Sequence, residues 1–324
     1  MVLSAVDADV LGVLAGLYRR QKYHLVGAHS AVKRCRWLYE SIVHGRACYK
    51  QKFYGIRSHR CVQMTPSLYY CTMRCLFCWR IQPRDVNPAF KEPEPPDRWD
   101  SPEEIVDGAI RAQLRLLSGY KGNPKADKRR LREAFEPKHA AISLAGEPTL
   151  YPFLGELIRE YHKRGFTTFL VTNGTNPRVL AQLEEEPTQL YVSLYATDAK
   201  GLARLCRPRI AGAWKRISET LGLLSSFNCP TVIRITLVRG FNMDDVEGYA
   251  RVIGKAEPTY VEPKAYMHVG YSRKRLGFSN MPTHAEVQRF AFQLAERLGY
   301  NVLDESKESR VVLLSRLEKP IKIA

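Results

Sequence analysis

The stretch YYCTMRCLFCWR, residues 69–80, carries three cysteines within eight positions: Cys71, Cys75 and Cys78. Two close thiols are typical of a disulfide or a redox pair. Four are typical of structural zinc, which four protein ligands bind tetrahedrally. Three thiolates on a cubane iron–sulfur cluster leave one iron free to bind a substrate or cofactor. This first cysteine triad therefore predicts an open cluster, with a zinc knuckle completed by a distant ligand such as His59, or a cluster that only transfers electrons, as alternatives.

Length and composition describe an ordinary globular protein. The chain has 324 residues, 45% hydrophobic and 26% charged, and one α/β barrel with additions fits this length as well as two domains. The opening segment lacks a basic start, so we expect no signal peptide, and no apolar run approaches the ~20 residues that cross a bilayer. We expect a cytoplasmic protein without membrane contact, whose eight cysteines bind metal rather than form disulfides.

The net charge of +17 indicates a polyanionic partner, and nucleic acid is the commonest one. A merely basic surface is the alternative. Two basic stretches are candidate RNA contacts. The run YSRKRLG lies after the last expected barrel strand and provides Arg273, Lys274 and Arg275. The run DKRRLRE is more often a solvated helix face; its candidates are Lys128, Arg129 and Arg130.

A regular alternation of apolar runs and amphipathic segments follows a proline-rich linker at residues 87–100. Ser101 with Glu104, and Thr283 with Glu286, match the capping box that begins a helix. The runs that we expect to form strands are CVQM, HAAISLAGEP, TTFLVTNGT, QLYVSLYA, TVIRITLV and TYVEPKAYMHVG, with RVVLLSRL as a closing strand. Strands that are apolar on both faces and alternate with helices indicate a parallel sheet.

These six units predict an α/β fold built as a partial (β/α)6 barrel, an incomplete version of the eight-stranded barrel. We place an N-terminal extension at residues 1–62, the barrel at 63–300 and the closing strand at 301–324. Within the extension, SAVKRCRWLYESIV reads as a helix that carries Cys35. Ligands of such barrels gather at the carboxyl ends of the strands.

The segment AGEPTLYP ends one of these strands with Gly146, Glu147 and Pro148. Glycine allows close backbone approach to a ligand, and proline fixes the turn, although the same tripeptide also suits a plain turn. Together, CTMRCLFCW and AGEP resemble the radical S-adenosylmethionine (SAM) superfamily. In that family the three cysteines hold a 4Fe-4S cluster and the open iron binds SAM.

The resemblance also implies further SAM contacts. Phe77 matches the aromatic position beside the last cysteine, and the Gly-Glu-Pro segment matches the one near the SAM amine, with Ala145 in place of its usual first glycine. Three polar residues at or near strand ends could hold the ribose and carboxylate of SAM, or could be structural: Asn173, Ser193 and Arg234.

A second cysteine triad lies in the extension, with the spacing C-x12-C-x12-C: Cys35, Cys48 and Cys61. A step of 13 residues turns a side chain by about 220° around a helix, so one straight helix cannot present all three. The segment must fold back if these thiols meet. Three unrelated buried thiols are the alternative.

The surrounding residues narrow the family. YHLVGAHSAVKRC, CYKQKFYGIRSHRCVQMTP, AYMHVGYSRKRL and NMPTHAEV resemble the radical SAM tRNA 4-demethylwyosine synthases in a short, archaeal-type form without a flavodoxin domain. The resemblance implies a second 4Fe-4S cluster on the second triad, a separate flavodoxin- or ferredoxin-type electron donor, pyruvate as cosubstrate, and tRNA-Phe bearing N1-methylguanosine next to the anticodon. It implies a carbon–carbon lyase of wybutosine biosynthesis. The other classes considered are a different radical SAM RNA-modifying enzyme, such as a methylthiotransferase, and a zinc-containing RNA-binding protein.

Lys50 lies two residues after Cys48. A lysine that loses its proton can form a Schiff base with a carbonyl, which the resemblance identifies as that of pyruvate. We therefore expect Lys50 to be catalytic or to hold pyruvate. The alternatives are a surface lysine, a lysine that only pairs with the substrate carboxylate, and the neighbouring Lys52 in its place.

Overall fold

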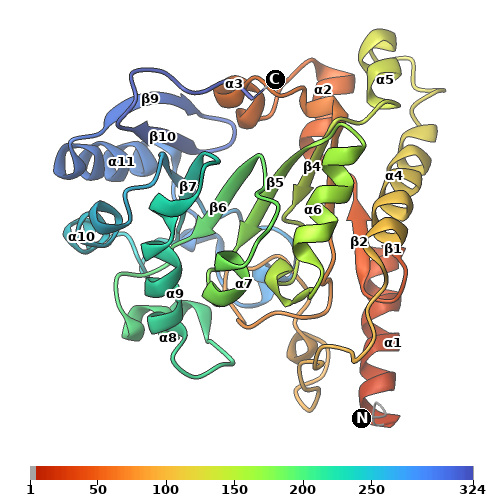
Figure 1. Ribbon diagram of the computed structural model, residues 1–324, viewed down its shortest axis with the longest axis horizontal. Helices are drawn as coiled ribbons and strands as arrows, with labels where there is room; N and C mark the ends of the chain where they lie inside the picture. Colours follow the sequence, from red (N-terminus) through yellow and green to blue (C-terminus); the bar gives the residue numbers. More distant parts are fainter. Residues whose placement is uncertain (1–4, 324) are drawn as a thin grey trace.

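The computed structural model describes residues 5–323, and within them ten strands form one sheet (Figure 1). Six neighbouring strands run parallel and follow one another in chain order. They are β3 (Cys61–Thr65), β4 (His139–Ile142), β5 (Thr167–Thr172), β6 (Gln189–Ser193), β7 (Thr231–Leu237) and β8 (Tyr260–Ala265). The predicted partial (β/α)6 barrel is confirmed, including every strand that the apolar runs indicated.

Helices connect the parallel strands, as parallel pairing requires. They are α4 (Pro102–Ser118), α6 (Leu154–Lys163), α7 (Pro177–Ala181), α8 (Ala199–Cys206), α9 (Ala213–Gly222) and α10 (Val246–Ala256), while α11 (His284–Leu298) follows the last parallel strand. The predicted capping boxes begin α4 and α11. Strands such as β6 are buried along their whole length, because one face meets these helices and the other faces the barrel interior. Among residues 5–323, no helix has the length and apolarity to span a membrane.

Antiparallel hairpins extend the sheet at both edges. On one side β2 (Ser30–Lys33) pairs with β3, and β1 (Tyr23–Val26) pairs with β2 next to the helix α1 (Ala5–Arg20). On the other side β10 (Val311–Ser315), the predicted closing strand, pairs with β8 and with β9 (Asn301–Ser306). The sequence did not indicate β1 or β2. Since the expected boundary at residue 62 falls inside β3, extension and barrel share one sheet.

The second cysteine triad is distributed over three separate elements. Cys35 precedes α2 (Arg36–His44), Cys48 precedes α3 (Tyr49–Tyr54), and Cys61 is the first residue of β3. The chain therefore folds back between the cysteines, as their spacing required. The predicted helix in SAVKRCRWLYESIV is wrong in its first part, because Ser30–Lys33 is a strand and the helix begins after Cys35.

The proline-rich linker is packed against the barrel, although it contains no helix or strand between residues 87 and 100. Glu92 and Arg80 form an ion pair at 3.3 Å with both side chains at most 3% exposed. The Trp99 ring meets the rings of His29 and Tyr151 edge-on. The linker therefore covers the loop of the first cysteine triad rather than separating two independent units.

Candidate active site

The first cysteine triad lies on the loop that follows the carboxyl end of β3. Backbone hydrogen bonds join this loop to the end of α8: Arg74 N to Cys206 O at 2.9 Å, and Leu76 N to Leu205 O at 3.0 Å. The guanidinium of Arg275 donates to the carbonyl oxygens of Leu76 and Cys78. The loop is thus held through its backbone groups, and none of its three thiols takes part in a disulfide.

The electrostatics of this loop suit an anionic iron–sulfur cluster. Burial raises the pKa of Cys71 and Cys78, so that an isolated thiolate here is costly, while the buried guanidinium of Arg80 acts in the opposite direction on both. The buried Nε of Arg74, between two of the cysteines, has no hydrogen-bond partner in the described chain. Cluster iron would supply the missing positive charge for the thiolates, so the residues present fit the cofactor.

Glu147 braces the loops at the ends of β4 and β5. Its carboxylate is 1% exposed and accepts hydrogen bonds from Thr149, Thr172 and the Asn173 N–H. Burial raises the pKa of this carboxyl group, and these hydrogen bonds lower it. The neighbouring Gly146 has φ +72°, and a Cβ there would lie 1.8 Å from a backbone oxygen of the first-triad loop segment. Glycine is therefore needed for packing of backbone on backbone.

Asn173 connects this brace to the first triad. Its Nδ2 donates to Thr72 Oγ1 at 2.9 Å and lies 3.8 Å from Cys71 Sγ. Phe77 packs on the ring of Tyr195, with centroids 4.8 Å apart, and Ser193 is buried on β6 and hydrogen-bonded to the same tyrosine. The structure thus brings six of the seven sequence-predicted SAM positions around one loop, with Pro148 starting the short helical turn Pro148–Leu150.

Lys50 lies with the second cysteine triad. The charges of Lys50 and of the three thiols influence one another, and all three cysteines stay partly exposed. Burial, followed by the charge of Arg234, lowers the Lys50 pKa to about 8, and burial raises that of Cys48 to about 11. The Lys50 Nζ lies 4.0 Å from the ring centroid of Phe169 and 4.3 Å from that of Tyr191. Within residues 5–323 it makes no hydrogen bond.

Arg234 belongs to this second group, contrary to its expected place beside SAM. Its guanidinium donates to the fully buried Glu262 at 2.8 and 3.1 Å and to Tyr49 Oη at 2.5 Å, and it lies 4.4 Å from the Tyr191 ring. Glu262 also accepts from Tyr54 Oη at 2.7 Å. The expectation is therefore corrected, since these partners occupy Arg234. Sequence reasoning missed Glu262, whose signal was a charged residue inside the buried run YVEPKAY.

Both triads face the same side of the sheet. Side chains alternate along a strand, so Phe169, Val171 and Asn173 point the same way from β5 and its end. Lys50 covers Phe169, and Asn173 touches Cys71. Four residues of extended chain separate these contacts, which corresponds to about 13 Å. The two triads therefore lie toward opposite ends of one strand, with its inner face between them.

Comparison with known proteins places this geometry in a family. Residues 65–253 match the radical SAM superfamily, and residues 255–316 match the wyosine base formation family. The chain is 54% identical over 307 residues to the S-adenosyl-L-methionine-dependent tRNA 4-demethylwyosine synthase of Pyrococcus abyssi, covering 94% of this chain and 88% of that protein. The corresponding protein of Pyrococcus horikoshii is 52% identical over the same shares. The chain belongs to the tRNA 4-demethylwyosine synthase family.

A solved structure agrees with this membership. The structure described as TYW1 with a lysine–pyruvate adduct bound superposes with a TM-score of 0.85 at 39% identity, and covers 96% of this chain and 98% of that one. For a radical SAM tRNA 4-demethylwyosine synthase, SAM and a 4Fe-4S cluster follow from the family. Membership decides against a methylthiotransferase and against a zinc-containing RNA-binding protein.

The candidate RNA contacts of this synthase family member divide into exposed and occupied side chains. Arg273 and Lys274 are exposed, although the Lys274 Nζ also donates to the carbonyl oxygen of Asp85 at 2.9 Å. Arg275 is only 8% exposed and pairs with Asp85 while it holds the first-triad loop. The prediction for Arg275 is therefore corrected, because its donors are used within the protein.

The second basic run forms α5 (Lys128–Ala134), which packs against α2 and the residues before β3 (Figure 1). Lys128 is exposed, and Arg129 is 84% exposed and pairs with Glu133 at 3.1 Å. Arg130 instead donates to the Ser41 carbonyl oxygen at 2.8 Å and so fixes α5 on α2. Lys128 and Arg129 remain candidate phosphate contacts.

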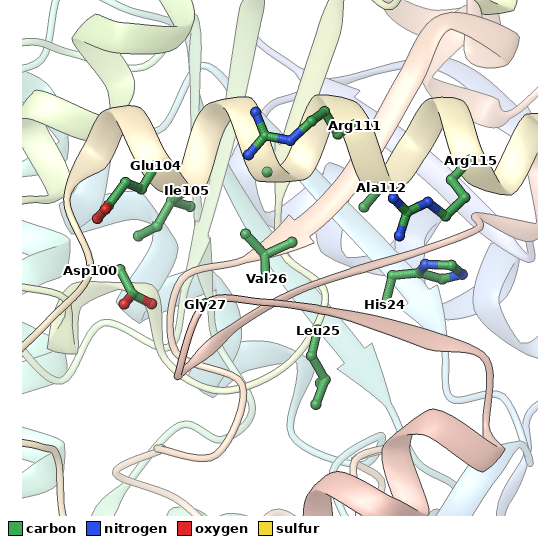
Figure 2. Close-up of a pocket in the computed structure, with 11 residues that line it drawn as sticks. His24, Leu25, Val26, Gly27, Asp100, Glu104, Ile105, Arg111, Ala112 and Arg115 are labelled. Carbon is green, nitrogen blue, oxygen red and sulfur yellow. The ribbon is translucent and has the colours of Figure 1, made fainter.

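A groove of about 360 Å³ lies beside this surface, between the edge strand β1 and helix α4 (Figure 2). His24, Arg111 and Arg115 line one part of it, and Asp100 and Glu104 line the other. The charge of Arg115 lowers the pKa of His24, after the larger effect of burial. None of the cysteines of either triad lines the groove, which lies along α4 on the side of the molecule that carries α5 (Figure 1).

Proposed function

We propose that this chain condenses N1-methylguanosine next to the anticodon of tRNA-Phe with carbons of pyruvate to form tricyclic 4-demethylwyosine, as a pyruvate-dependent carbon–carbon lyase. The observation that carries this proposal is the position of Lys50, an amine without a hydrogen-bond acceptor in the described chain, between two aromatic rings and beside the second cysteine triad. A methylthiotransferase has no use for such an amine.

In this proposal each triad would hold one 4Fe-4S cluster. Cys71, Cys75 and Cys78 would hold the SAM-binding cluster, and Cys35, Cys48 and Cys61 would hold the second. When bound, the first cluster would supply the electron for reductive cleavage of SAM to methionine and a 5′-deoxyadenosyl radical, and that radical would take hydrogen from the N1-methyl group. The donor of that electron would be a separate flavodoxin- or ferredoxin-type protein.

The residues around Cys71 would position SAM. Asn173 has its amide beside Cys71, Glu147 fixes the Asn173 backbone, and Phe77 closes the side next to Tyr195. Gly146 and Pro148 shape the turn that carries Glu147, and Ser193 orients Tyr195. Any side chain in place of Gly146 would put its Cβ against the backbone of Ser67, so the turn must keep glycine to hold Glu147 where it lies.

Lys50 would capture pyruvate covalently. Its neutral amine attacks the carbonyl carbon, water leaves, and an imine forms. A pKa of about 8 leaves roughly a tenth of the amine neutral at pH 7, far more than an exposed lysine provides. The lysine–pyruvate adduct in the description of a 39% identical relative supports this role. Lys52 is a poorer candidate, because its Nζ pairs with Asp304 at 2.6 Å.

The tRNA would lie across the exposed cations. Phosphate contacts hold an RNA in register without reading its sequence, and Arg273, Lys274, Lys128 and Arg129 are exposed enough to make them. The net charge of +17 favours such contacts through counterion release. The groove with Arg111 and Arg115 adds two cations on the same edge as α5.

Mass analysis of nucleosides tests the proposal. Protein purified without oxygen and reduced is incubated with SAM, pyruvate and tRNA-Phe bearing N1-methylguanosine. We expect the tricyclic base only when all components are present. The variant with alanine at all three first-triad cysteines serves as the control. Absence of the tricyclic base, with 5′-deoxyadenosine produced normally, would reject pyruvate condensation as the reaction.

A further inference from the structure

A second lysine lies close to Lys50 on the inner face of the sheet. Lys264 on β8 is half-buried, and burial with the charge of Arg234 lowers its pKa to about 8. Its Nζ donates one hydrogen bond, 2.6 Å long, to the carbonyl oxygen of Ser309, and lies 4.9 Å from the ring centroid of Tyr49. An ammonium carries three donor hydrogens, so this contact leaves donors unused.

Lys264 and Lys50 flank the same charged group. Arg234 and Lys50 both lie over the Tyr191 ring. Arg234 also donates to the Oη of Tyr49, and Lys264 lies over the ring of that tyrosine. Glu262 and Cys48 act on the charge of both lysines. The two amines therefore face one small region next to the second cysteine triad.

Strand geometry places Lys264 on the side of this region that faces the SAM segment. Glu262 and Lys264 are two residues apart on β8, so they share a face and lie about 7 Å apart. Lys264 is the one nearer the carboxyl end of the parallel strands, where Glu147 and Asn173 lie. A small molecule attached to Lys50 would extend between the second triad and that end.

The charges show which cation is available for an anion. Arg234 is paired with the buried carboxylate of Glu262 at 2.8 Å, and Lys50 must be neutral to form an imine. Lys264 has no carboxylate partner within residues 5–323; its one hydrogen bond goes to a backbone carbonyl. An uncompensated ammonium in a desolvated place is costly, and a bound carboxylate would remove that cost.

We propose that Lys264 forms a carboxylate subsite, which binds the carboxylate of a 2-oxo acid while its carbonyl carbon meets Lys50. The inference rests on the proposed function and deepens it. It assigns selectivity for an anionic 2-oxo acid over a neutral carbonyl compound to one residue. Two amines then divide the work: Lys50 forms the covalent bond, and Lys264 orients the acid that forms it.

Covalent capture by the holoenzyme, without oxygen or SAM, tests the subsite. Cyanoborohydride reduces the imine to a stable adduct. Mass analysis of the peptide that contains Lys50 then gives the fraction of protein carrying the adduct, at increasing concentrations of pyruvate or of its neutral methyl ester. In Lys264→Met, we expect half-maximal capture to need roughly 10- to 100-fold more pyruvate, the value of one charge-assisted hydrogen bond, with little change for methyl pyruvate. Lys264→Arg, which keeps the charge, should retain most of the preference for pyruvate.

Lys33→Met is the matched control. Lys33 also donates to a backbone carbonyl, that of Gln21 at 2.9 Å, and covers an aromatic ring, that of Tyr23 at 4.1 Å, but it lies on β2 away from Lys50. We expect wild-type capture from it. Iron content and circular dichroism check that each variant is folded, and Lys264→Gln replaces the methionine variant if that one does not fold.

The outcomes separate this inference from the proposed function. Unchanged pyruvate dependence in Lys264→Met, or an equal loss in Lys33→Met, overturns the subsite and leaves the Lys50 imine intact. Isothermal calorimetry of pyruvate binding tests the subsite when no covalent adduct forms. If no adduct forms but pyruvate binding is lost in Lys264→Met, the imine is rejected and the subsite stands. If the wild type binds no pyruvate, both are rejected.

Discussion

Replacing Glu147 with glutamine should destabilise the protein although it changes only one atom of the side chain. One carboxylate oxygen accepts from the N–H and Oγ1 of Thr149 and from Thr172 Oγ1, at 3.1, 2.7 and 2.6 Å, and the other accepts from the Asn173 N–H at 2.8 Å. All four hydrogen bonds are thus donated to the carboxylate by its partners. A glutamine amide has one acceptor and one donor end, so in its better orientation it places N–H against the Asn173 N–H.

The size of the effect follows from that single mismatch. A buried donor left without an acceptor costs about 1–3 kcal/mol. An unfolding entropy of about 2.1 cal/mol/K per residue means that, in this chain of 324 residues, each kcal/mol shifts the melting temperature by about 1.5 °C. Glu147→Gln should therefore melt roughly 1.5–4.5 °C below the wild type. Because Asn173 also touches Cys71, cleavage of SAM to 5′-deoxyadenosine should slow in the same variant.

Thermal unfolding of the anaerobic holoenzyme, followed by circular dichroism, measures the first effect, and chromatography of 5′-deoxyadenosine measures the second. Glu184→Gln is the matched control, since Glu184 pairs with Arg159 at the surface and is 80% exposed; such a pair contributes about 0–1 kcal/mol. If Glu147→Gln has the same melting temperature as the wild type, the four hydrogen bonds do not stabilise the loops and the reasoning is refuted. A lower melting temperature with unchanged SAM cleavage would limit Glu147 to stability.

Three further predictions concern the clusters, the amine and the RNA. Alanine at all three cysteines of either triad should leave about half the iron by colorimetric assay, and only the first-triad variant should lose SAM cleavage; 5′-deoxyadenosine from that variant would contradict the assignment. Lys50→Ala should cleave SAM without making the tricyclic base, and Lys50→Arg should also fail, because guanidinium stays protonated; turnover by the arginine variant would reject the imine. Arg273→Ala should reduce the log–log salt slope of tRNA binding by about 1, whereas Arg275→Ala should lower the melting temperature and leave that slope unchanged. A changed salt slope for Arg275→Ala would instead indicate that Arg275 contacts the RNA.

The order of the parallel strands could be predicted because it depends on local patterns. The run QLYVS has an apolar centre at residues 190–192 and is buried at every position, and the capping boxes at Ser101 and Thr283 began helices where expected. The edge strands β1 and β2 could not be predicted in this way. They are four residues each, too short for a clear alternation, and they are held by pairing with each other and, through β2, with β3.

Cysteine spacing and the flanking motifs identified the family from the sequence alone, because ligands of one loop must lie close in the chain to reach one cluster. The sequence could not assign long side chains that meet across strands. Arg234 and Arg275 were both read as ligand contacts, yet one neutralises Glu262 and the other holds carbonyls of the first-triad loop. A buried or half-buried cation takes whichever anion or carbonyl the fold brings within reach, and residues 28 positions apart or more become neighbours only in the folded sheet. For the same reason, the proximity of Lys264 to Lys50 was decided by tertiary structure alone.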